Sequence, residues 1–447
     1  MTVPMLLGIA TMMGQGLIDA WFLGQVGDRA LAAFSFGFPM LMIITSVAIG
    51  LGAGTSSVVA QAIGAEDHRR ARRLATDSLL LSFLIAATLS AIGILTIGPL
   101  FKLLGAPADM IPMIRSFMTI LYSGVPFLVV GMVGTSSMRA TGDMRLPGKL
   151  MIFSALLNVL LDPIFIFGLG PVPAMGLNGA ATAALFARGT MFLGTIYFLV
   201  HRLDMVSFNK PDSVELRKSW SDILHVGLPA AGTNAIIPVA VALVTAMIAR
   251  FGPDAVAGFG VASRLESMVL VIYYALSSVI GPFVGQNLSA GREGRIQLSL
   301  RLCAQFCLAS GLVIAILLAL LSGFIPNLFS QNEDVVSVTR LFLWIVPISY
   351  GAYGIVMVVN AAFNGLGKPM PAVYISVTRM IVLYIPLALI GTRWFGIAGI
   401  FGAYAIANIL SGLLAYVWAK RTAHNLLAVA EIHADTATGH KQQEREP

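Results

Sequence analysis

Long apolar stretches follow one another along almost the whole chain, separated by short polar connections. A helix needs about 20 residues to cross the hydrocarbon core of a bilayer. Twelve stretches reach that length, near residues 3–24, 33–62, 75–99, 112–136, 149–168, 177–200, 222–250, 256–287, 298–322, 336–362, 371–392 and 397–419. Backbone amides in lipid must be satisfied within their own element, so each stretch is expected to be a helix. The sequence therefore predicts an all-α polytopic membrane protein.

The composition agrees with a surface that faces lipid. Charged residues make up 11% of the chain and hydrophobic residues 57%, whereas soluble domains carry about 25% charged residues. The net charge of +7 does not indicate a nucleic-acid partner, because the cations form no basic face interleaved with aromatic residues. We find neither a nucleophile–base pattern nor a Walker lysine motif. We expect neither an enzyme nor an ATP-driven pump, and no cofactor.

The positions of Lys and Arg indicate how the helices are oriented. The even-numbered connections and the C-terminal side hold seventeen cations, at positions 69, 70, 72, 73, 139, 145, 149, 202, 210, 217, 218, 292, 295, 301, 368, 420 and 421. The odd-numbered connections hold six, at positions 29, 102, 115, 250, 340 and 393. Loops rich in Lys and Arg stay on the cytoplasmic side. Both termini are therefore expected to be cytoplasmic.

The two halves of the chain are related by an internal repeat. A shift of 225 residues places Pro4 on Pro229, Gly27 on Gly252, Gln61 on Gln286, Arg115 on Arg340 and Gly142 on Gly367. A shift of 220 places residues 176–179 on 396–399. We therefore expect two pseudo-symmetric six-helix bundles, at 1–200 and 222–420, a cytoplasmic connector at 201–221 and a cytoplasmic, largely disordered tail at 421–447. Parallel repeats of this kind are typical of transporters that alternate access between the two sides of a membrane.

Four polar residues stand inside apolar stretches of the first half. Asp19 lies deep in the first stretch with Gln15 one turn before it, and Asp162 lies in the fifth with Asn158 one turn before it. An ionisable side chain inside a bilayer is costly unless it is paired, protonated or hydrated, so such residues mark function. The two carboxyls can share a proton or bind a cation. The alternative is that each is a helix-end aspartate exposed at the interface.

The second half has no acids at the corresponding positions, Val244 and Leu387, but it has other charges. Arg264 and Glu266 lie in the eighth stretch and Arg379 lies in the eleventh. Glu266 is interpreted either as a group that attracts cations into a substrate cleft or as the partner of Arg379 in a structural ion pair.

Pro4 stands at the start of the first stretch. A proline inside a helix weakens it and permits bending, so Pro4 is a candidate hinge. The alternative is an ordinary proline of a first helical turn.

Several motifs together resemble the multidrug and toxic compound extrusion (MATE) family. They are Pro4 with Asp19 and residues 24–27, the glycine-rich residues 50–54 with 61–65, residues 158–163, residues 179–181 and residues 285–287. The resemblance covers nearly the whole chain. It implies twelve helices in two lobes and export of organic, often cationic, compounds in exchange for protons or sodium. By the same resemblance, Asp19, Asn158 and Asp162 form a cation site in the first lobe, and Pro4 is tied to bending of the first helix.

Two departures from the family pattern bear on the coupling ion. The pattern often ends in a threonine that joins the cation site, but Ala184 stands there and Thr182 lies two residues earlier. The sodium-coupled branch also has carboxylates inside the seventh and tenth helices, which this chain lacks. Proton coupling is therefore favoured, with sodium at Asp19, Asn158 and Asp162 as the alternative.

These observations favour a secondary active exporter with small hydrophobic or cationic substrates. We expect a monomer in the cytoplasmic (inner) membrane of a bacterium, in contact with membrane lipid as its only other partner. The alternative function is a flippase for lipid-linked oligosaccharides or their precursors, which has a related two-lobe fold. Such proteins usually have a cationic central cavity, whereas here acids stand in the first lobe.

Overall fold

The computed structural model describes residues 2–207 and 212–443, and every regular element in them is helical. Among these residues, eleven helices are long and apolar enough to span a membrane. A further span comes from Pro253–Val269 and Val271–Ser289, which are bent by 42° at a short break. The predicted fold class, an all-α polytopic membrane protein with about twelve spans, is confirmed.

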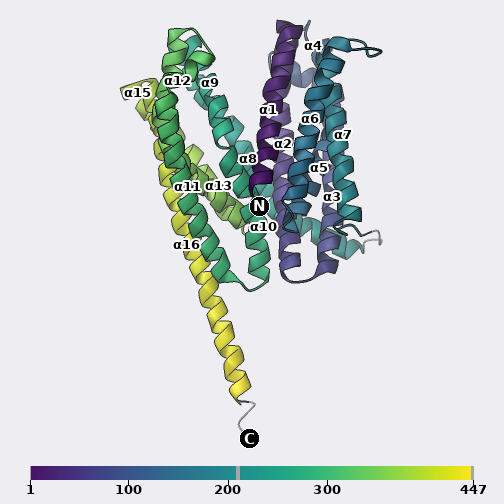
Figure 1. Cartoon of the computed structure of the whole chain (residues 1–447), viewed down its shortest axis with the longest axis vertical. Helices are drawn as coiled ribbons and strands as arrows, with labels where there is room; N and C mark the ends of the chain where they lie inside the picture. The colour runs from purple at the N-terminus through teal and green to yellow at the C-terminus, as the bar shows by residue number, and fades with distance from the viewer. Residues whose placement is uncertain (1, 208–211, 444–447) are drawn as a thin grey trace. The chain divides into compact units, whose positions relative to one another are not determined.

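Contacts divide the described chain into two compact units. The first unit comprises Met1–Val59 and Asp67–Pro238. It contains α1 (Thr2–Val26), most of α2 (Asp28–Gly64), α3 (His68–Leu103), α4 (Ile111–Ser123), α5 (Val125–Ala140), α6 (Arg145–Pro163), the π-helical turn η1 (Ile164–Gly168), α7 (Leu177–His201) and the first part of α8 (Ser213–Ile248). Figure 1 shows these helices in purple to teal. We refer to this unit as the N-lobe.

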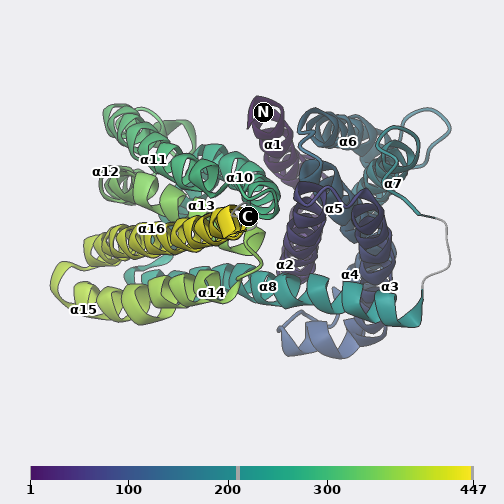
Figure 2. The ribbon, with the colours of Figure 1, turned by 90° about the horizontal axis from the view of Figure 1, so that it is seen from below.

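The second unit, the C-lobe, comprises Ala60–Glu66 and Val239–Pro447. Its helices are α9 (Pro253–Val269), α10 (Val271–Ser289), α11 (Glu293–Leu321), α12 (Glu333–Ile345), α13 (Tyr350–Gly365), α14 (Met370–Val377), α15 (Ile385–Phe395) and α16 (Ile397–Gln443). Its short elements are η2 (Ala249–Phe251), η3 (Pro326–Leu328), η4 (Val346–Ser349) and the π-helical turn η5 (Thr378–Tyr384). Figure 2 shows α16 running between α12 and α15.

The internal repeat reappears in the packing inside each lobe. In the N-lobe, α5 contacts α3 and α7, and α7 also contacts α4 and α6. In the C-lobe, α13 contacts α11 and α16, and α16 also contacts α12 and α15. The fifth span of each lobe contains a π-helical turn, which ends the span in the N-lobe (η1) and lies inside it in the C-lobe (η5). The same sequence repeat has therefore produced the same neighbours twice.

The boundary between the compact units differs from the expected connector at 201–221. It falls inside α8, after Pro238, because the first part of that helix packs against α2. A Cβ atom built on Gly54 would lie 2.2 Å from the carbonyl oxygen of Ile223, and one on Gly50 would lie 2.5 Å from the amide nitrogen of Ala231. Glycine permits this backbone contact. Four residues of the expected connector, 208–211, lie outside the described residues.

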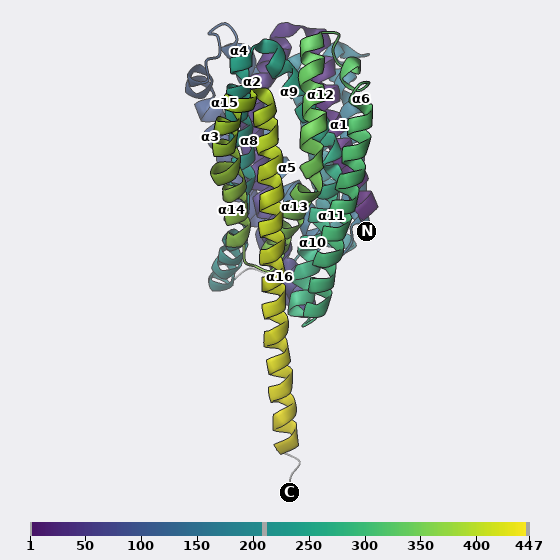
Figure 3. The same cartoon turned by 90° about the vertical axis from the view of Figure 1, so that its left-hand side faces the viewer.

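The C-terminal segment also differs from the expected disordered tail at 421–447. Helix α16 continues without a break to Gln443, and Figure 3 shows it passing beyond the other helices of its lobe. Residues 421–443 contain no proline and many alanines, leucines and other good helix formers. Low hydrophobicity indicates that a segment does not join a core, but it does not prevent a helix from continuing. Residues 444–447 lie outside the described residues.

Candidate functional site

Helices α1 and α6 pack side by side in the N-lobe, and their contact positions the candidate acids. A Cβ atom built on Gly148 of α6 would lie 2.5 Å from the carbonyl oxygen of Pro4 in α1. One on Gly8 would lie 3.2 Å from the carbonyl oxygen of Gly148. The absence of side chains at these glycines lets the two backbones approach closely, as is common in membrane helix pairs. The close approach brings the polar faces of both helices together.

The four polar residues predicted for the N-lobe meet across this contact. Gln15 Nε2 of α1 donates a hydrogen bond to Asn158 Oδ1 of α6. Asn158 Nδ2 donates to Asp162 Oδ1 at 3.2 Å. The side chain of Asp19 lies close enough to Asp162 and Gln15 to interact with both. Residues four apart share one helix face. Here the Gln15–Asp19 face of α1 lies against the Asn158–Asp162 face of α6.

The acids of this cluster have unused hydrogen-bonding capacity. Asn158 and Asp162 are fully buried, with 0% exposure. Asp19 Oδ1 and Asp162 Oδ2 are buried and have no hydrogen-bond partner among the described residues. Two buried carboxylates at close range repel each other, and protonation of either converts an acceptor into a donor. A single proton shared between Asp19 and Asp162 would therefore remove the repulsion between the two carboxylates and supply a hydrogen-bond donor.

Arg188 of α7 belongs to the same cluster. Its charge interacts with that of Asp19, and its buried Nη1 has no hydrogen-bond partner among the described residues. The sequence analysis did not connect this arginine with the two acids. With both acids ionised and Arg188 protonated, the cluster has a net charge of −1, which one proton neutralises.

Thr182, predicted to contribute a hydroxyl to the site, donates instead to the carbonyl oxygen of Asn178 on its own helix at 2.8 Å. This bond spans one turn of α7, an arrangement common for threonine in helices. Among the described residues, the hydrogen bonds of the two acids do not include Thr182. The departure from the family pattern at Ala184 is therefore not compensated by Thr182 in this conformation.

Pro4 is the third residue of α1 as the structure describes it, and α1 runs unbroken from Thr2 to Val26. The role of Pro4 as a hinge stays a prediction, and so does the alternative of a first-turn proline. The contact of Pro4 with Gly148 places it where a bend of α1 would change the packing against α6.

The C-lobe has a polar cluster of its own around Arg379. This arginine is only 3% exposed. Its Nη1 donates to Asn408 Oδ1 at 3.1 Å, and Asn408 Nδ2 donates to Ser349 Oγ at 3.1 Å. The guanidinium carbon lies 4.3 Å from the centroid of the Tyr353 ring. A cation over an aromatic face in a dry site is held in one orientation.

Glu266 joins this cluster, whereas Arg264 does not. Glu266 interacts with the hydroxyl of Tyr404 and with the charge of Arg379, but among the described residues no ion pair within 4.0 Å joins Glu266 to Arg379. Arg264 is exposed, and its spacing of two residues from Glu266 means that the two side chains do not face each other. Tyr404 therefore lies close to both Glu266 and Arg379.

Sequence reasoning missed Tyr353, Tyr404 and Asn408, although the repeat contained a signal for one of them. A shift of 220 places Arg188 on Asn408, so the same position of α7 and α16 bears a polar residue in both lobes. Tyr353 and Tyr404 correspond to Leu128 and Ala184. Nothing in the first half indicates an aromatic cluster there, and only packing reveals it.

Replacing Arg379 with lysine is expected to destabilise the protein by about 1–3 kcal/mol, because lysine keeps the charge but loses the planar fork that bonds Asn408 and stacks on Tyr353. The thermal midpoint of the purified protein measures this loss. Arg264→Lys is the matched control, because the exposed Arg264 makes neither contact, and its midpoint should equal that of the parent protein. Equal midpoints for Arg379→Lys and Arg264→Lys would contradict the assignment.

Comparison with known proteins supports a transport role. A family model described as MatE matches residues 4–164 and 229–390. A relative from Shewanella oneidensis named as an FAD transporter is 39% identical over 421 residues, which cover 94% of this chain and 93% of the relative. A probable multidrug resistance protein of Bacillus subtilis, YoeA, is 26% identical over 440 residues, covering 95% of this chain and 94% of that protein.

Solved structures have the same fold. The crystal structure of a mutant of the Vibrio cholerae MATE transporter VcmN matches with a TM-score of 0.91 at 31% identity, covering 95% of each chain. The two stretches matched by the family model begin at Pro4 and Pro229, so each half of the sequence contains one copy of the family unit. These matches, with the two-lobe helical fold and its intramembrane acids, show that the chain is a membrane efflux transporter of the MATE family and not an enzyme.

Proposed function

We propose that this chain is a secondary active exporter in which one proton, bound between Asp19 and Asp162, is exchanged for an organic substrate. The observation that supports this most directly is the pairing of two carboxyls from α1 and α6, each with a buried oxygen that lacks a partner. Bilayer burial favours the neutral form of one acid. Because Arg188 already balances one negative charge, the stoichiometry of the site is one proton.

Protons fit this site better than sodium. Hard cations are usually bound by several oxygen ligands at once. Asn158 Oδ1 already accepts from Gln15, and the Thr182 hydroxyl donates to its own helix. Among the described residues, the buried acid oxygens without a hydrogen-bond partner are Asp19 Oδ1 and Asp162 Oδ2. A proton needs no further ligands, so no cofactor or metal is required for the cycle.

Transport follows if the proton binds the two access states of the protein unequally. A ligand that binds both states equally shifts nothing. The α1–α6 contact provides such a difference, because any bending or sliding of α1 changes the distance between Asp19 and Asp162. Rocking of the lobes then alternates access between the two sides of the membrane. The arrangement we propose is a monomer in the cytoplasmic membrane with both termini in the cytoplasm.

Small hydrophobic or cationic compounds are the proposed substrates, because the N-lobe cluster has a net negative charge when its proton is released. FAD is a second candidate, because the relative named as an FAD transporter is 39% identical to this chain, whereas a relative named as a multidrug resistance protein is 26% identical. The family assignment favours export of either over the flippase alternative.

Transport into everted vesicles that contain the protein distinguishes these substrates. With an acidic interior, we expect a cationic dye such as ethidium to accumulate, and its accumulation to continue when sodium is replaced by potassium. Accumulation of FAD without dye would favour the second candidate. If neither compound accumulates above vesicles without the protein, or if accumulation requires sodium, the proposed function is wrong.

A further inference from the structure

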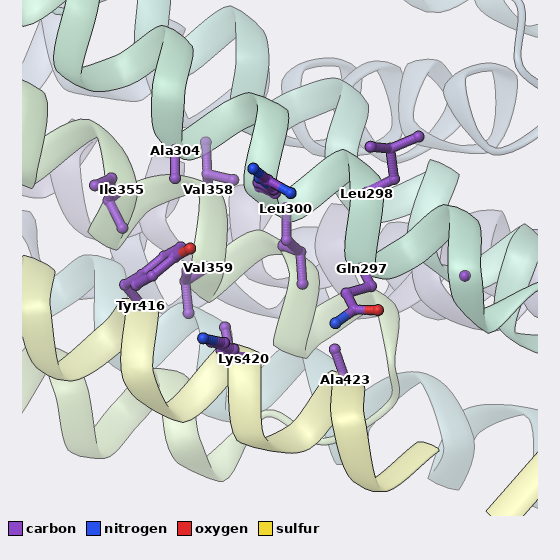
Figure 4. A pocket seen from close by; sticks show the side chains of 13 residues that line it. Gln297, Leu298, Leu300, Ala304, Ile355, Val358, Val359, Tyr416, Lys420 and Ala423 are labelled. Carbon is purple, nitrogen blue, oxygen red and sulfur yellow. The ribbon is translucent and has the colours of Figure 1, made fainter. Parts of the chain in front are cut away.

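A cavity of about 480 Å³ lies inside the C-lobe, away from the Arg379 network. Figure 4 shows side chains of α11 along one side, Tyr416 and Lys420 of α16 along the other, and Val358 and Val359 of α13 between them. Arg301 and Leu298 of α11 also line it, and both are exposed, so the cavity opens to the surface of the lobe.

The internal repeat accounts for part of the space in this cavity. At the corresponding place in the N-lobe, a Cβ atom on Gly134 would lie 2.2 Å from Thr195 Cγ2, 3.3 Å from Leu199 and 3.5 Å from Leu79. The shifts of 225 and 220 place Leu79 on Ala304 and Leu199 on Ala419. Both alanines line the cavity. Loss of two leucine side chains at facing positions leaves space, and only part of it is taken up by Val359, which stands where the N-lobe has Gly134.

The same comparison shows that the cavity has gained positive charge. The shift of 225 places Thr76 on Arg301, and the shift of 220 places Val200 on Lys420. Both cations line the cavity. Among the described residues, the ion pairs within 4.0 Å include neither of them. The alanines that leave space and the two cations therefore occur together in the C-lobe. The corresponding positions of the first half bear leucines and uncharged residues.

The cations lie near one end of the membrane span. Arg301 is eight residues after the start of α11 at Glu293, which is about 12 Å along a helix. Lys420 is near the end of the apolar part of α16, which runs to Leu426. By the distribution of Lys and Arg this is the cytoplasmic side. Lys and Arg at such a depth extend toward lipid headgroups.

We propose that this cavity binds the phosphate headgroup of an anionic phospholipid from the cytoplasmic leaflet. Arg301 and Lys420 contact the phosphate, Gln297 and the Tyr416 hydroxyl offer hydrogen bonds to the headgroup, and the exposed Leu298 lies where an acyl chain would leave the cavity. Basic pockets between membrane helices on the cytoplasmic side bind lipids of this charge. The proposal rests on the proposed orientation and is independent of the transported substrate.

Native mass spectrometry of the purified full chain, titrated with phosphatidylglycerol or phosphatidylcholine, tests the proposal. We expect bound phosphatidylglycerol in preference to phosphatidylcholine. The Arg301→Ala/Lys420→Ala variant should bind phosphatidylglycerol about thirtyfold more weakly, since each cation near a membrane surface contributes about 1 kcal/mol and 1.4 kcal/mol is tenfold. Arg295→Ala/Arg421→Ala is the matched control, because it removes two exposed cations of the same helices that do not line the cavity, and its binding should be unchanged.

A second variant tests the space without changing the charge. Ala304→Leu/Ala419→Leu restores the leucines of the N-lobe and should also abolish selective phosphatidylglycerol binding. Equal loss of binding in the Arg295→Ala/Arg421→Ala control would overturn the proposal. So would displacement of the lipid by inorganic phosphate or FAD with the same dependence on Arg301 and Lys420, because the site would then serve a soluble anion.

Discussion

Replacing Asp19 with asparagine is expected to lower proton-driven export by about 5–150-fold, the usual range for a lost coupling between two sites. Asparagine has the shape of a protonated aspartate and keeps a permanent donor toward Asp162. The variant should therefore fold normally but remain in the state that the proton favours. Everted vesicles with an imposed proton gradient measure export, and a pH-sensitive dye measures proton release when substrate is added.

Asp162→Asn should give the same result, and the double variant should be no worse than either single one, because the two carboxyls serve one proton. Asp109→Asn is the matched control. Asp109 belongs to the same lobe, but it is 56% exposed and pairs with Arg29 at 2.5 Å. Surface pairs contribute little to stability, so export should be unchanged. Normal proton release from Asp19→Asn would rule out the shared-proton site.

Replacing Gly179 with valine is expected to destabilise the N-lobe and to abolish transport. A Cβ atom at Gly179 would lie 2.3 Å from the carbonyl oxygen of Phe165 and 2.7 Å from the amide nitrogen of Ile166. These are backbone atoms of η1, which begins two residues after Asp162, so they cannot move aside as a flexible side chain can. Overpacking of this kind costs about 1–3 kcal/mol or more.

The expected loss of transport has a geometric cause. The start of α7 must shift away from η1, and α7 bears Arg188 nine residues later. The cation that balances Asp19 would then move from its place. Thermal midpoints of the purified protein and export in vesicles measure the two effects separately.

Gly189→Val is the control on the same helix. A Cβ atom at Gly189 would meet nothing within 4 Å, and valine suits a helix slightly better than glycine does. This variant should be as stable as the parent protein and should transport normally. If Gly179→Val and Gly189→Val have equal midpoints, the close packing of α7 on η1 is not a determinant of the fold.

The all-α polytopic fold could be predicted because a bilayer leaves few choices. An apolar stretch of 20 residues in lipid must form its backbone hydrogen bonds internally, so length and hydropathy were enough to predict the helices. The 225-residue shift was enough to show which helix of the first half corresponds to which helix of the second. Asp19 and Asp162 could be predicted as site residues for a related reason, because placing a carboxyl in hydrocarbon costs free energy and such residues usually have a function. Their amide neighbours Gln15 and Asn158 followed from helical spacing alone.

The partners of these residues depended on tertiary packing. Arg188 meets Asp19 because Gly148 lets α6 pack closely on α1 and Gly179 lets α7 pack closely on η1, and no periodicity within one helix indicates which neighbour a cation will face. Tyr353 and Tyr404 surround Arg379 for the same reason. The first part of α8 joined the N-lobe through Gly54, although the repeat assigned it to the second half.

The sequence by itself determined that the chain lies in a bilayer, how many times it spans it, that its two halves are repeats, and which acids are candidates for function because their burial in lipid is costly. Tertiary structure alone decided which arginine balances those acids, where the lobes divide and which facing positions leave a cavity. The physical reason is that the free-energy cost of placing a residue in lipid depends on that residue and its position in one helix, so the sequence of that helix is enough to recognise it. Close packing depends on the shapes of two helices at once, and those shapes meet only in the folded chain.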